Sequence, residues 1–115
     1  MGDYSQVTTT TGSAADAERL ARSVVQARLG ACAQIVPLRS VYRWDGEVRV
    51  EDEWQCVVKT PAARVGELIA HIRAHHPYEV PEVIATPISS GDPAYLAWLD
   101  RETIGVETLA GEGRS

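Results

Sequence analysis

The side chains of this sequence that are best suited to bind a transition metal are its two cysteines and three histidines. His71 and His75 stand four residues apart, so on a helix they share one face and are spaced to bind one ion. No glutamate directly follows His71, which excludes the helix motif of zinc proteases. Histidines near the end of a helix also interact favourably with its dipole, and this structural interpretation is the preferred one.

The two cysteines fit a structural role. Cys32 stands between two alanines, and Cys56 is in phase with Trp54 and Val58 in an alternating segment. Free cysteine is among the most buried residue types, so we expect both to be small core residues. One pair of cysteines is not a disulfide framework, and this usage fits a reducing cytoplasm.

Aromatic and charged residues form a second candidate site. Rings, one amine and one carboxylate suit a cleft that binds a small anionic or zwitterionic ligand. Lys59, the only lysine, stands where a strand gives way to a helix, and helix N-termini attract anions. Packing of the aromatic rings between subunits is the other interpretation, and the two do not exclude each other. The candidate cleft residues are Tyr42, Trp44, Lys59, Tyr78, Glu82 and Trp98.

The acidic run Glu51-Asp52-Glu53 is the remaining cluster of possible ligands. Alternation along a strand sends Asp52 to the face opposite its two neighbours. We therefore expect a solvated acidic edge, with at most a weak, oxygen-based affinity for divalent ions.

Several functions find no support. The net charge of −5 and the scattered arginines give no basic patch for nucleic acid. No apolar run reaches the roughly 18 residues of a membrane span, and residues 1–6 do not resemble a secretory signal. The chain has no glycine-rich phosphate loop, no asparagine to position water, and no nucleophile paired with a base. We expect neither an enzyme nor an organic cofactor.

Strand and helix signals alternate along the chain. β-branched residues favour a strand over 4–10, and Ser13 is a suitable N-cap for a helix that ends at Gly30. A long strand over 31–44, with Pro37 at a bulge or an edge, meets its return strand over 47–60. The Asp45-Gly46 pair between them favours a tight type I′ turn.

The second half of the chain repeats this alternation. Thr60-Pro61 predicts the start of a helix, and Pro77 predicts its end near His75. A strand follows over 83–88, and Asp92 is a suitable N-cap for a last helix. Residues 1–104 are expected to form one domain, and the glycine-rich polar stretch 105–115 a flexible tail.

This order predicts an α+β fold, the ferredoxin-like βαββαβ arrangement with an additional C-terminal helix and an antiparallel sheet. If Asp45-Gly46 forms a two-residue turn, Arg39 lies opposite Asp52 and the two form a cross-strand pair. Apolar residues alternate onto both sheet faces, for example Ile84 against Val83. Two helices cover one face only, so we expect self-association to cover the other.

Five segments resemble the signature blocks of the CutA divalent-cation-tolerance family in order and spacing. The resemblance spans about residues 5–104 and implies a homotrimer, a link to divalent cations and to copper above all, and kinship with PII signalling proteins. It also implies copper ligands at Cys32 and His75, whereas Thr9 stands where the family has a second cysteine. The matching segments are Ala31-Cys32-Ala33, Tyr42-Arg43-Trp44-Asp45-Gly46, Val58-Lys59-Thr60, the run from His75 to Glu82, and Tyr95-Leu96-x-Trp98-Leu99.

These observations lead to one expected function and one alternative. The chain is expected to be a cytoplasmic, non-enzymatic homotrimer in metal-ion tolerance that binds copper, another divalent ion or a small ligand between subunits. The alternative is a PII-like signalling module that senses a small anionic metabolite in the same cleft. Neither function involves nucleic acid or a membrane.

Overall fold

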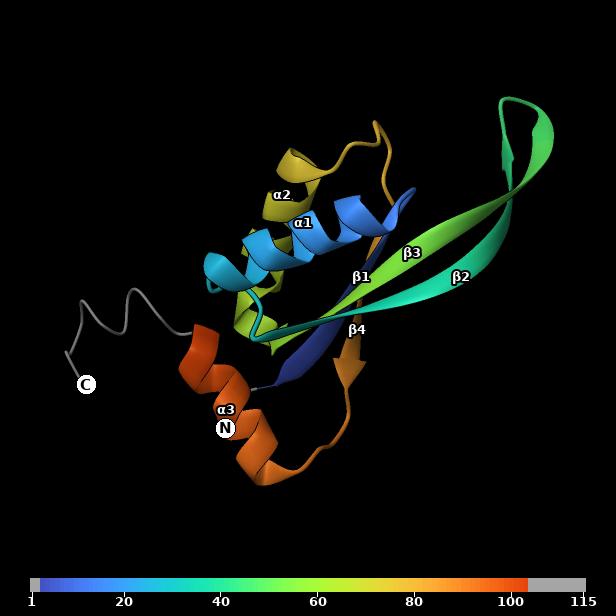
Figure 1. The fold of residues 1–115 in the computed structure, drawn as a ribbon. Coiled ribbons are helices and arrows are strands. Elements are labelled where there is room, and N and C mark those ends of the chain that lie inside the picture. Colours follow the sequence, from blue (N-terminus) through green and yellow to red (C-terminus); the bar gives the residue numbers. More distant parts are fainter. Residues whose placement is uncertain (1–2, 104–115) are drawn as a thin grey trace.

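The computed structural model describes residues 3–103 (Figure 1). A 3-10 turn, η1 (Ala62–Arg64), precedes the second helix. The strands are antiparallel in the order β2-β3-β1-β4, which confirms the predicted α+β fold with a ferredoxin-like order and an additional C-terminal helix. The predicted tail lies outside the described residues. The elements are β1 (Tyr4–Thr11), α1 (Ala14–Gln26), β2 (Cys32–Trp44), β3 (Glu47–Pro61), α2 (Val65–His75), β4 (Val83–Ile88) and α3 (Pro93–Thr103).

The hairpin of β2 and β3 is the longest feature of the molecule. Asp45 and Gly46 have φ values of 58° and 78°, as a type I′ turn requires. The pairing runs without a bulge from the turn to the far end of β2. Pro37 therefore fits because β2 is an edge strand, and not because of a bulge. Arg39 lies opposite Asp52 with Nε 3.3 Å from Oδ1, which confirms the predicted pair. Both side chains are exposed, so the pair contributes roughly 0–1 kcal/mol.

The helix starts follow the capping residues only in part. Ser13 and Asp92 cap α1 and α3 by accepting backbone N–H groups at 3.0 Å. The predicted start of α2 at Thr60-Pro61 is wrong, because β3 continues through Pro61. The buried Thr60 hydroxyl donates to the Leu29 carbonyl, so it does not cap a helix. α2 ends at His75 as predicted.

Two hydrophobic clusters lie on opposite faces of the sheet. α1 and α2 cover one face, and their cluster includes Val7, Val24, Val58, Leu68 and Ile72. α3 covers one end of the other face, where Tyr4, Ala31 and Leu99 pack together. The rest of this second face is open, and we call it the open face.

Exposed apolar side chains confirm that the protomer leaves hydrophobic surface uncovered. Val36 and Ile84 are 44% and 49% exposed on the open face. Figure 1 shows the hairpin tip extending beyond the helices, where Val41, Val48 and Val50 are 66%, 64% and 57% exposed. Isolated exposed apolar residues are ordinary, but a continuous set along one hairpin is typical of an interface.

Among residues 3–103, no helix combines the length and the hydropathy needed to cross a lipid bilayer.

Gly30 does not cap α1, contrary to prediction, and has a packing role instead. The helix ends at Gln26, and Arg28 adopts the left-handed conformation with a φ of 61°. Gly30 is buried where the connection crosses the core, and a Cβ there would lie 2.3 Å from Cγ1 of Val58 and 2.9 Å from Cγ1 of Val24.

The Gly30→Ala substitution should therefore lower the free energy of unfolding by about 1–3 kcal/mol, because both valines must move. Gly66→Ala is the matched control, since a Cβ at that helical position meets nothing within 4 Å. It should leave stability unchanged or raise it by up to about 1 kcal/mol. Urea unfolding of both variants measures this, and equal effects would contradict the account.

Candidate functional site

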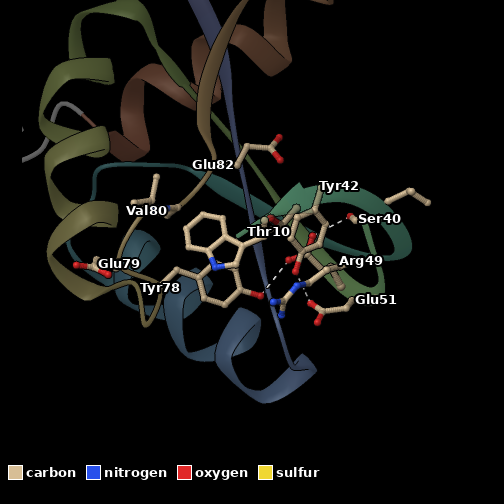
Figure 2. Close-up of a pocket in the computed structure, with 13 residues that line it drawn as sticks. Thr10, Ser40, Tyr42, Arg49, Glu51, Tyr78, Glu79, Val80 and Glu82 are labelled. Carbon is tan, nitrogen blue, oxygen red and sulfur yellow. Dashed lines mark hydrogen bonds between the residues drawn. The ribbon is translucent and has the colours of Figure 1, made fainter. Parts of the chain in front are cut away.

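A groove of about 690 Å³ runs between the hairpin and the segment that connects α2 to β4 (Figure 2). We call it the hairpin groove. Its volume lies within the range of sites for small organic ligands. Residues 78–82 form one wall, and the hairpin, with one residue of β1, forms the other. The residues that line it are Thr10, Ser40, Val41, Tyr42, Trp44, Arg49, Glu51, Glu53, Tyr78, Glu79, Val80, Pro81 and Glu82.

Glu53 is the buried carboxylate of the hairpin groove, with 7% of its surface exposed. The Ser40 hydroxyl donates to one of its oxygens at 2.7 Å, and the Tyr78 hydroxyl donates to the other at 2.9 Å. Burial, and then the hydrogen bond to Glu53, raise the pKa of Tyr78 to about 12. Glu53 forms no ion pair with any residue in 3–103. Two neutral donors therefore satisfy a carboxylate that lacks a counter-charge.

A second tyrosine and carboxylate pair lies nearer the hairpin tip. The Tyr42 hydroxyl donates to Glu51 at 2.6 Å, and this hydrogen bond is the main cause that raises the pKa of Tyr42. Arg49 lies opposite Tyr42 in the sheet. Its Nε is buried and has no hydrogen-bond partner within the described part of the chain. This N–H is available to a water molecule or a ligand group.

His76 fixes the position of the Tyr78 wall. Its ring bonds to the Thr10 carbonyl through Nε2 at 2.8 Å, and its Nδ1 accepts the backbone N–H of Tyr78 at 3.0 Å. A carbonyl only accepts and an N–H only donates, so His76 is the neutral tautomer with its proton on Nε2. Its residue surface is 9% exposed. The buried ring thus joins the start of the connecting segment to β1.

Four of the six predicted cleft residues come together in the hairpin groove: Tyr42, Trp44, Tyr78 and Glu82. Lys59 does not line it, because its side chain lies farther along β3 and donates to Gln34. Trp98 packs in the cluster beneath α3, with its ring centroid 5.6 Å from that of Tyr95.

The sequence prediction missed the polar residues on the hairpin side of the groove. Alternation in the sequence places Arg49, Glu51 and Glu53 on one face, and the acidic run there is expected to be a solvated edge. That interpretation is wrong for Glu53, which the Tyr78 wall buries. Ser40 carried no sequence signal until the hairpin register placed it on the groove side of the sheet.

The residues implied for copper do not form a site within one protomer. Cys32 lies opposite Lys59 in the strand register and faces the side of the sheet that α3 covers. Burial, and then the Cys32 thiol, raise the pKa of Tyr95 there. His75 belongs to α2, which covers the opposite face. Thr9 is fully buried, and its hydroxyl has no partner among the described residues. A copper ion therefore does not fit these three positions together.

The His71 and His75 rings stack with their centroids 4.1 Å apart. His71 Nε2 lies 2.9 Å from the Ser23 hydroxyl, and His75 Nδ1 lies 2.8 Å from the His71 carbonyl. Burial, and then the nearby His75, lower the pKa of His71. Within residues 3–103, no three His, Cys, Asp or Glu side chains gather as a metal site requires. His71 thus bonds to Ser23 of α1, and His75 bonds to a carbonyl of its own helix.

The fold and the groove define a small α+β protein with a candidate ligand site beside an extended hairpin. Residues 5–102 match the family described as CutA1 divalent ion tolerance protein. The chain therefore belongs to the CutA1 divalent ion tolerance family.

Named relatives agree with this family. The divalent-cation tolerance protein CutA of Thermus thermophilus is 44% identical over 88 residues, which cover 76% of this chain and 85% of that protein. The chloroplastic protein CutA of Arabidopsis thaliana is 45% identical over 87 residues, 75% of this chain and 48% of the relative. The chain thus spans about half the length of the plant proteins it matches.

Solved structures carry the same fold. CutA1 from Oryza sativa aligns with a TM-score of 0.87 at 38% identity, covering 91% of this chain and 97% of that one. CutA from Xylella fastidiosa aligns with a TM-score of 0.85 at 38% identity, covering 89% and 99%. The alternative of a PII-like module has no support in these comparisons. Cytoplasmic location stays a prediction, since the names of some relatives mention the chloroplast or the periplasm.

The Tyr78 hydroxyl should stabilise the fold in a pH-dependent way. A raised pKa favours the protonated hydroxyl in the folded state, so its contribution is complete below the ordinary value near 10 and is lost as the pH rises through about 12. Tyr78→Phe should lower the free energy of unfolding by about 1–3 kcal/mol at pH 8, and by less above pH 10.

Urea unfolding of the wild-type protein and of Tyr78→Phe between pH 8 and pH 11 measures this difference. The ultraviolet absorbance of tyrosinate should also show that Tyr78→Phe removes a component titrating near pH 12. Ionisation of Tyr78 at the ordinary tyrosine pKa of about 10 would contradict the role of its hydrogen bond to Glu53.

The His76 hydrogen bonds should control the order of the Tyr78 wall. His76→Ala removes both bonds and should cost about 2 kcal/mol or more, because the Thr10 carbonyl and the Tyr78 N–H lose their partner. His76→Asn retains an acceptor two residues before Tyr78, as in an Asx turn. Amide hydrogen exchange at Tyr78 should be much faster in the alanine variant and close to wild type in the asparagine variant. Unchanged protection in His76→Ala would contradict this role.

Proposed function

We propose that the chain acts in divalent-cation tolerance as a non-enzymatic homotrimer that binds a small ligand in the hairpin groove, at the contact between subunits. The observation that carries the proposal is the groove itself, which joins a buried carboxylate, aromatic side chains and a fixed wall in a protein of this family. Binding rather than catalysis is proposed because the Ser40 hydroxyl meets Glu53 directly, and none of the residues that line the groove is a histidine that could transfer its proton.

The uncovered apolar surface supports self-association. The valines of the hairpin tip have little contact with their own protomer, and the molecule extends 53 Å along its longest axis but 27 Å and 20 Å along the others. β2 is an edge strand with exposed Val36 and Ile35, which suits pairing with a second copy. A threefold assembly allows each hairpin to reach a neighbour.

The copper prediction enters this proposal in a limited form. Cys32 and His75 lie on opposite sides of the sheet, so any joint site for a divalent ion requires a second subunit. The function proposed does not depend on such a site, because the hairpin groove offers ligand contacts without it.

Sedimentation equilibrium of the whole chain should give three times the 12.5 kDa mass of the protomer. Val50→Glu places a charge on the exposed hairpin face and should shift the mass toward that of one chain while circular dichroism stays folded. Ala15→Glu adds the same charge to an exposed position of α1 and should leave the assembly intact. A wild-type protein that sediments as a single chain at micromolar concentration would contradict the trimer.

A further inference from the structure

We propose that the hairpin groove selects an organic cation, a small molecule with an ammonium group, and that Glu53, Glu82 and Trp44 recognise that group. This inference rests on the proposed ligand-binding function and names the class of the ligand. It departs from the anionic or zwitterionic ligand that the sequence predicts, because the fold changes which charged residues meet.

The lining of the hairpin groove carries more negative than positive charge. Four glutamates line the groove against one arginine, and the only lysine lies outside it. An anion would approach these carboxylates without the amine that was expected to bind it. The chain as a whole is also acidic, with a net charge of −5. Both the groove and the surrounding surface therefore favour a positive ligand.

Glu53 is a buried carboxylate that forms no ion pair with the described residues. A carboxylate that is buried without a cation keeps a desolvation cost that its two neutral donors offset only in part. An ammonium group placed beside it supplies the missing counter-charge. Glu82 is exposed on the opposite wall, so the two carboxylates can approach one ligand from two sides.

Two aromatic side chains of the groove are exposed to a ligand. The Trp44 side chain is 48% exposed and Tyr78 is 37% exposed, so each offers ring surface to a ligand in the groove. The face of an aromatic ring attracts a cation, most strongly when the ring is tryptophan. Aromatic faces grouped around the charge are a usual means of binding alkylated ammonium groups.

A bare metal ion fits the groove less well than an organic cation. The carboxylates line a cavity of about 690 Å³, and in the described part of the chain no three of them converge as a metal site requires. The volume, the apolar wall at Val80 and the rings instead suit a ligand with carbon atoms around its charge.

Calorimetric titration of the whole chain with three probes tests the inference. Choline is the organic cation, 3,3-dimethylbutan-1-ol is its neutral isostere, and succinate is an organic anion. Choline should bind at least tenfold more tightly than the isostere and the anion. Trp44→Ala and Glu82→Gln should each weaken choline by roughly three- to thirtyfold, whereas Glu67→Gln, the same charge change on α2, should not.

Glu53→Gln should weaken the binding of choline further. If this substitution of a buried residue unfolds the protein, the result for Glu82→Gln still tests the inference. Equal affinity for choline and its isostere would overturn the cation assignment. Tighter binding of succinate, lost in Trp44→Ala, would also overturn it while leaving the proposed ligand groove intact. No binding of any probe would count against the groove as a ligand site, and so against the proposed function as well.

Discussion

The register of the long hairpin is the constraint on which the rest of the structure depends. The Asp45-Gly46 turn admits one pairing, which continues without a bulge to Cys32 opposite Lys59. Side chains alternate between faces along both strands, so a shift of one residue would exchange every side chain between core and open face. With the observed register, Val58 enters the core while Glu53 faces the groove.

The same register explains why the groove is charged and yet partly buried. The hairpin supplies carboxylates on one face, and the connection after α2 supplies the tyrosine that covers them. His76 holds that connection against β1 through its hydrogen bond to the Thr10 carbonyl, and its other ring nitrogen accepts the Tyr78 N–H, so the wall does not rely on hydrophobic contact alone. The result is a site whose shape is set by backbone-directed bonds and whose charge remains available to a ligand.

Sequence reasoning predicted the fold well because its signals are local. The turn residues, the caps at Ser13 and Asp92, and the alternation along the strands each report on a few neighbouring residues, and the structure confirms them. The candidate site was predicted only in part, because it depends on contacts between distant segments. Tyr78 and Glu53 stand 25 residues apart, and neither residue type nor spacing shows that they meet. The prediction that Lys59 lies in the cleft was wrong for the same reason, since the fold directs its side chain to Gln34.

The central claim is that the hairpin groove, as the hairpin and the Tyr78 wall form it, is a site for a small organic cation. A crystal structure of the whole protein grown with choline tests it most directly. We expect density for the ammonium group between the Trp44 ring and the carboxylates of Glu53 and Glu82. A groove filled instead by side chains of a neighbouring subunit, with choline bound elsewhere or not at all, would contradict it.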